Sequence, residues 1–147
     1  TSTNVIFAPE LRNNIKSNNI LAIKSQFNSM RLISIISSLI SIFFLLLLGE
    51  QFILYFYSSN YASSYNLLLI LMFGQLIHSF FGPVGLIANL SGDHNFGAIA
   101  KLITILFNIL FLYLTYHYIG LVGLAISYVF SLLIWNIIVY KRIKYLI

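Results

Sequence analysis

Residues 32–48 form an unbroken run of seventeen uncharged side chains, thirteen of them Leu, Ile or Phe and the other four Ser. A helix of roughly 17 to 25 mostly apolar residues is long enough to cross the hydrocarbon core of a bilayer. The run therefore predicts a membrane-spanning helix. Three further stretches have the same character, and we place these spans at about 66–90, 96–116 and 120–140. The sequence thus predicts an all-α membrane protein with four transmembrane helices.

The composition of the whole chain agrees with this assignment. Of its 147 residues, 60% are hydrophobic and 7% are charged, whereas soluble domains carry about 25% charged residues. The absence of cysteine excludes a disulfide scaffold. The chain opens at Thr1, without Met, inside a segment that is already amphipathic. We therefore expect a fragment of a longer protein.

The basic residues predict the orientation of the spans. All eight Lys and Arg lie in three segments, residues 1–31, 91–101 and 141–147, which four crossings place on one side of the membrane. The loops on the other side contain none. Basic residues are retained in the cytoplasm during insertion, so both ends of this segment should face the cytoplasm. Bases distributed in this way do not form a nucleic-acid-binding surface, and we expect no nucleic-acid partner.

The first segment, residues 1–31, combines apolar side chains at near-helical spacing with four bases. This pattern is typical of a helix lying at a membrane surface. We therefore divide the chain into a cytoplasmic amphipathic linker helix, 1–31, and a four-span bundle, 32–147.

The second predicted span contains a helix break. Gly82, Pro83 and Gly85 lie within it, and proline removes a backbone donor and clashes with the preceding turn. A broken span in lipid requires neighbouring helices, or water in a cavity, to satisfy the freed backbone groups. Such discontinuous helices line the pathway in many transporters.

Polar side chains follow one side of the second and third spans. They give five candidate pathway-lining residues: Gln75, His78, Lys101, Thr104 and Asn108. The alternative is that these stripes are helix-packing faces, with Asn and Thr bonding to a neighbour. For Lys101 we favour an ammonium group that extends to the cytoplasmic headgroups, and the alternative is contact with an anionic cargo.

Small residues indicate close helix packing elsewhere. Serines line one side of the first span, and Gly123, Ser127 and Ser131 recur at an interval of four on the last. Small residues at this interval let helix backbones approach closely in membranes.

The chain lacks the residue groups that an enzyme or a metal site would need. The acids Glu10, Glu50 and Asp93 lie on separate segments, and the histidines 78, 94 and 117 have no metal-ligand spacing. We therefore expect no enzyme activity, metal or cofactor.

Several sequence blocks resemble a known family. They are FAPEL, LLGEQFILYFYSSNYASSYNLLLIL, GPVGLIANLSGDHN and GLVGLAISYVFSLLIWN. Together they resemble the C-terminal part of polysaccharide flippases, of the O-antigen and teichuronic acid type, in the multidrug/oligosaccharidyl-lipid/polysaccharide exporter superfamily. Members often have a proline before the last span, where this chain reads YHYIG at residues 116–120.

The resemblance implies that this chain is part of the second lobe of a MATE-like transporter with twelve to fourteen helices in the bacterial cytoplasmic membrane. Such proteins move a lipid-linked oligosaccharide to the outer leaflet by alternating access. The implied partners are a polyprenyl diphosphate-linked oligosaccharide, membrane lipids and the remaining helices of the transporter. Two alternatives remain open: a MATE-type exporter of drugs or small metabolites, and a non-transporting four-span membrane protein.

Overall fold

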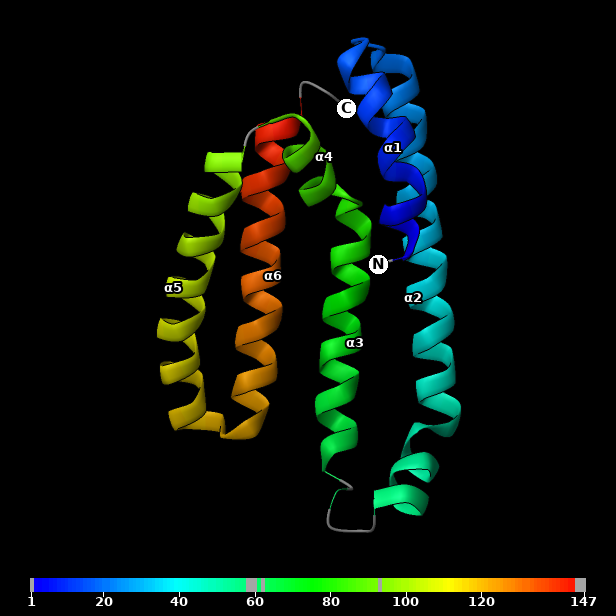
Figure 1. Cartoon of the computed structure of the whole chain (residues 1–147). Coiled ribbons are helices and arrows are strands. Elements are labelled where there is room, and N and C mark those ends of the chain that lie inside the picture. Colours follow the sequence, from blue (N-terminus) through cyan, green and yellow to red (C-terminus); the bar gives the residue numbers. More distant parts are fainter. Residues whose placement is uncertain (1, 58–60, 62, 93, 145–147) are drawn as a thin grey trace.

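The computed structural model describes residues 2–57, 61, 63–92 and 94–144, and its regular elements in this part of the chain are all α-helices (Figure 1). In chain order they are α1 (Ser2–Lys16), α2 (Ile20–Tyr57), α3 (Ser64–Phe81), α4 (Val84–Leu90), α5 (His94–Ile119) and α6 (Leu121–Ile143). Four of them, α2, α3, α5 and α6, are long and apolar enough to cross a membrane. The prediction of an all-α chain with four such helices is confirmed.

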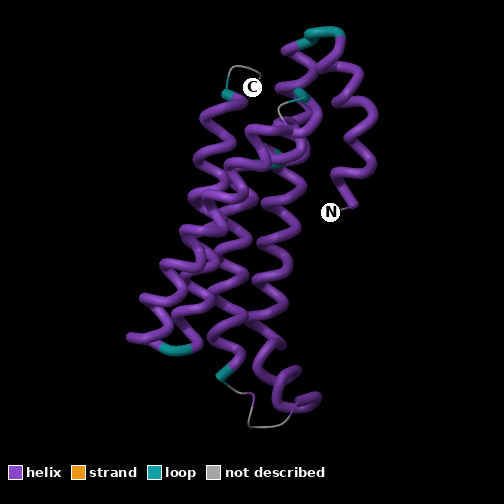
Figure 2. Tube along the Cα trace, turned by 60° about the vertical axis from the view of Figure 1, so that its left-hand side comes forward, coloured by secondary structure: helices purple, strands orange, loops and turns teal. Residues whose placement is uncertain are grey.

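The four long helices lie in a row, in the order α5, α6, α3, α2 (Figure 1). Each packs on its neighbour in that row, and α6 has both α5 and α3 beside it. Figures 1 and 2 both place the α1–α2 turn, α4, the start of α5 and the end of α6 at one end of the molecule. The segments that carry the eight bases therefore meet at that end, as four crossings require.

The first segment differs from its prediction as one amphipathic linker helix over 1–31. α1 ends at Lys16, Asn18 takes a left-handed conformation with φ 51°, and α2 begins at Ile20. The helix then passes the predicted boundary at residue 31 without interruption. Leu11 and Phe27 are buried in a cluster with residues of α4, α5 and α6. The apolar side of α1 thus packs against protein, because a turn at Asn18, a residue type that tolerates this conformation, folds it back on α2.

Helix α2 is longer than the predicted first span. Its 38 residues extend about 57 Å at 1.5 Å per residue, almost twice the roughly 30 Å hydrocarbon thickness. Residues 32–48 form its middle, and near its end the helix turns aside (Figure 1). Its first three turns pair with α1, and Ile23 and Phe27 from these turns are buried in the same cluster as residues of α4, α5 and α6.

The predicted second span, 66–90, is divided in the structure. α3 ends at Phe81 and α4 begins at Val84, with Gly82 at φ 71° and Pro83 between them. The chain leaves helical geometry where Gly82 and Pro83 predict it, but Gly85 lies inside α4. Val84 and Ile87 of α4 are fully buried, and α4 packs on α1 and α6. This short helix closes the basic end of the bundle.

The remaining spans lie close to their predicted positions. α5 and α6 contain the expected 96–116 and most of 120–140, and they are separated by Gly120 alone, whose φ of 58° lets the chain reverse. Close packing at small residues follows the expected pattern. Gly123 contacts the Thr115 backbone between α5 and α6, and Gly74 contacts Val129 between α3 and α6.

Candidate functional site

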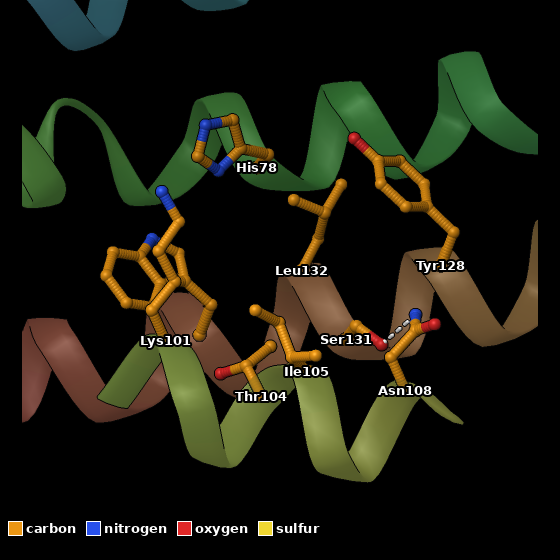
Figure 3. A pocket seen from close by; sticks show the side chains of 9 residues that line it. His78, Lys101, Thr104, Ile105, Asn108, Tyr128, Ser131 and Leu132 are labelled. Carbon is orange, nitrogen blue, oxygen red and sulfur yellow. Dashed lines mark hydrogen bonds between the residues drawn. The ribbon is translucent and has the colours of Figure 1, made fainter. Parts of the chain in front are cut away.

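A cavity of about 470 Å³ opens between α3 and α5, with α6 as its floor (Figure 3). Four of the five candidate pathway residues line it: His78 from α3 and Lys101, Thr104 and Asn108 from α5. The other lining residues are Ile105, Tyr128, Ser131, Leu132 and Trp135. The polar stripe predicted on the third span therefore faces the same space as His78 of the second.

Gln75 does not line this cavity. It lines a neighbouring hollow of about 500 Å³ with Leu68, Leu71, Met72 and Tyr128. Tyr128 lines both spaces. The structure thus separates one predicted residue from the set.

Asn108 both packs and lines the cavity. Its amide nitrogen donates to the Ser131 hydroxyl at 2.5 Å and approaches the Ser127 carbonyl at 3.4 Å. The Thr104 hydroxyl donates to the Ala100 carbonyl at 2.8 Å, within its own helix. Helix packing and lining of a cavity are therefore compatible roles for Asn108. The residue joins α5 to α6 by its hydrogen bond, and it also borders the cavity.

Lys101 is directed across the cavity. Its side chain starts on α5 and points over α6 toward α3, with the ammonium group on the side of His78 (Figure 3). Lys101 is exposed and lies in the part of α5 nearest the basic end. The structure thus places the Lys101 ammonium group at the cavity.

His78 is held by a residue that the sequence analysis did not select. Its Nδ1 lies 2.8 Å from Nδ2 and 3.0 Å from Oδ1 of Asn136 on α6. Asn136 is fully buried, and its Nδ2 also donates to the Leu132 carbonyl at 2.8 Å. The sequence does contain a sign of this role, because Asn136 is a lone amide within an otherwise apolar stretch. Polar groups inside a membrane span are costly and usually have partners.

A second hollow, of about 270 Å³, lies at the helix break. Gly82, Pro83, Gly85, Leu86 and Asn89 line it together with His78 and Trp135, which also line the main cavity. A Cβ atom at Gly85 would lie 3.7 Å from the Trp135 ring, in ordinary contact. All three residues predicted for the break therefore border a space adjoining the main cavity, although only two of them form the break itself.

The histidines and acids of the described residues do not form a metal site. Within the described ranges, no group of three or more His, Cys, Asp or Glu could hold a metal ion. Glu10 lies on α1 and Glu50 near the far end of α2, while Asp93 falls outside the described residues. What the cavity offers to a ligand is an ammonium group, an imidazole, an amide and hydroxyls in a largely apolar wall.

Comparisons of the chain with protein-family models, with curated proteins and with solved structures gave no match. Its function is therefore inferred from the chemistry of the cavity and from the sequence.

Proposed function

We propose that this chain is part of a transporter that moves a lipid-linked oligosaccharide of the polyprenyl diphosphate type across the bacterial cytoplasmic membrane. One observation carries the proposal: polar side chains from α3 and α5 meet in a single cavity over α6, within helices of membrane-spanning length. Polar and ionisable groups are expensive inside a membrane and commonly mark a substrate pathway.

The chemistry of the lining suits a phosphorylated sugar. An ammonium group such as that of Lys101 pairs with phosphate oxygens through charge-assisted hydrogen bonds. The hydroxyl of Thr104 and the amide of Asn108 match sugar hydroxyls, which donate and accept hydrogen bonds. Apolar neighbours such as Ile105 and Leu132 reduce competition from water.

The row of helices supports a place within a larger assembly. The cavity is open on one face, and α5, at the end of the row, exposes large apolar side chains that include Leu106, Leu110 and Tyr113. Lipid covers such side chains on one side of a transporter lobe, and further helices of the same transporter cover the cavity side. Alternating access then opens the cavity to one leaflet at a time. In this proposal the basic end, which holds the α1–α2 turn and the end of α6, faces the cytoplasm.

The proposal is tested by following the glycan and its lipid-linked precursor in the organism of origin. Deleting the gene should abolish surface glycan and leave the precursor on the cytoplasmic leaflet. Wild-type protein should restore export, whereas Lys101→Gln should restore less than about a tenth of it, since a charged hydrogen bond contributes about 1.5 to 3 kcal/mol.

Lys141→Gln is the matched control, because Lys141 lies near the end of α6 and does not line the cavity. It should restore export fully. A deletion strain with normal surface glycan and no precursor accumulation would refute the proposal.

A further inference from the structure

Trp135 lies where two spaces of the molecule meet. It lines both the main cavity of about 470 Å³ and the hollow of about 270 Å³ at the helix break. On α6 it follows Ser131, another residue of the main cavity, by about one turn, so the two share a face of the helix. Trp135 also packs against the buried apolar cluster that includes Val84 and Val139. The indole is therefore held by protein while it borders open space.

The indole N–H group of Trp135 is available to a ligand. Nε1 of tryptophan can only donate, and within the described ranges Trp135 makes no side-chain hydrogen bond. Every buried side-chain nitrogen or oxygen in those ranges has a partner, so Nε1 is accessible. A Cβ atom at Gly85 would lie 4.0 Å from Nε1 and 3.7 Å from Cζ2 of the ring. Because Gly85 lines the hollow and has no side chain, this edge of the indole borders the hollow.

The rest of the hollow suits an uncharged ligand. Its lining residues include an imidazole, from His78, but no Lys, Arg, Asp or Glu. Asn89 adds an amide that can both donate and accept, and this exposed side chain makes no hydrogen bond in the part of the chain that the structure describes. Pro83 and Leu86 supply apolar surface. This combination fits a molecule that has both hydroxyl groups and C–H faces.

We propose that the hollow at the helix break is a subsite for one uncharged sugar ring, which lies against the indole of Trp135. The C–H groups of a sugar ring are slightly positive and the π face of an indole is negative, while Trp135 Nε1 and the Asn89 amide are available to the hydroxyls. The volume of the hollow is close to the lower end of the range for small-molecule sites, about 300 Å³, which suits a single ring.

The subsite deepens the proposed function and rests on it for the nature of the cargo. The phosphate attached to the ring would lie at Lys101 in the main cavity, which Trp135 also lines. Trp135 thus stands between the place for the sugar and the place for the phosphate.

An organic cation is the competing ligand, because tryptophan also attracts cations to its face. The charges around Trp135 argue against it. No carboxylate is among the described residues that line either space, and Lys101 lines the main cavity together with Trp135. Repulsion between like charges is strong where water is scarce. A sugar ring is therefore favoured, and a cation is one outcome of the test.

The single tryptophan makes the test direct. Trp135 is the one Trp among the 147 residues, so the complete chain labelled with ¹⁵N-tryptophan gives one indole N–H signal in NMR spectra, which needs no assignment. The chain is held in micelles of a polyoxyethylene detergent, which contains no sugar, phosphate or ammonium group. The probes are the 1-phosphates of glucose, galactose and N-acetylglucosamine, and the controls are inorganic phosphate and tetramethylammonium.

We expect at least one sugar phosphate to shift the indole signal saturably, and both controls to leave it unchanged. A signal that responds to none of the three sugar phosphates overturns the subsite. An equal shift with inorganic phosphate shows that the ring is not recognised and overturns it too. A response to tetramethylammonium without one to the sugar phosphates assigns the hollow to cations instead.

Two variants test the contacts of the ring. Asn89→Ala should weaken the apparent affinity about fivefold, the effect of one hydrogen bond. Gly85→Ala narrows the space beside Nε1 within a helical segment and should weaken binding severalfold. Asn66→Ala is the matched control, because Asn66 is exposed on α3 and lines neither space. Wild-type affinity in both Asn89→Ala and Gly85→Ala overturns the placement of the ring.

The deletion strain described above judges transport separately. Normal surface glycan in that strain would refute the proposed function, even with sugar phosphates bound at Trp135. Loss of surface glycan together with a silent indole signal would leave the proposed function standing and overturn the subsite.

Discussion

The hydroxyl groups of Ser38 and Ser79 lie 2.6 Å apart where α2 meets α3. Ser79 also donates to the Gln75 carbonyl at 2.9 Å, so the proton between the two serines belongs to Ser38. Both side chains are buried. A hydrogen bond between helices inside a membrane contributes about 0.6 to 2 kcal/mol, and this one joins α2 to the rest of the row.

Ser38→Ala should therefore lower the free energy of unfolding by about 1 kcal/mol. Reversible unfolding in detergent micelles measures the change. Ser37→Ala is the control, since Ser37 is exposed on the same helix and its side chain should be dispensable. Equal stabilities for the two variants would mean that the serine pair does not stabilise the contact.

Gly82→Ala should be more disruptive than Gly85→Ala. At Gly82 the φ of 71° with a ψ of −163° is a conformation that essentially only glycine adopts, at a cost of about 1 to 3 kcal/mol for alanine, and the added Cβ would lie 3.0 Å from the Phe27 ring. At Gly85 the helix is regular and the new methyl group only touches Trp135. Thermal unfolding should show a clear loss for Gly82→Ala and little change for Gly85→Ala. The reverse order would contradict the geometry of the break.

Asn108→Leu should preserve membrane insertion but reduce surface glycan severalfold. Leucine removes the bond to Ser131 and the amide that borders the cavity, at a stability cost of about 0.6 to 2 kcal/mol. Immunoblots of membranes and quantification of glycan separate the two effects. Asn66→Leu is the control for added apolar volume. Normal glycan at normal protein level would leave Asn108 with a packing role alone.

The orientation of the chain can be mapped without removing any native thiol, because the sequence contains no cysteine. The introduced thiols of Arg12→Cys and Lys144→Cys should react only with thiol reagents that reach the cytoplasm. The thiol of Tyr118→Cys should react with an impermeant reagent added outside. All three positions are exposed. Labelling of Arg12→Cys and Lys144→Cys from opposite sides would contradict four crossings.

Much of the helical pattern follows from local rules. Long uncharged runs place the four long helices, and the backbone chemistry of Gly82 and Pro83 ends α3 near Phe81. The helical period puts Lys101, Thr104 and Asn108 on one side of α5, and the structure turns that side toward a cavity. These features depend on neighbours within a few residues along the chain.

The features that sequence reasoning missed depend on contacts between distant segments. The return of α1 depends on the backbone of Asn18 and on apolar partners in α2 and α4. His78 and Asn136 are 58 residues apart, and helical spacing carries no information about such a pair. Gln75 lies three residues from His78 on α3, but the two line different hollows, and both hollows are also lined by Tyr128 from α6.

The hairpin of α5 and α6 holds two sides of the cavity together. One turn residue, Gly120, joins the two helices, and bonds from Asn108 to Ser131 and from Thr115 to the Gly123 carbonyl fasten them along their length. The floor of the cavity on α6 and the wall that carries Lys101 on α5 therefore belong to one fastened unit. The opposite wall, α3, meets this unit where Gly74 packs on Val129.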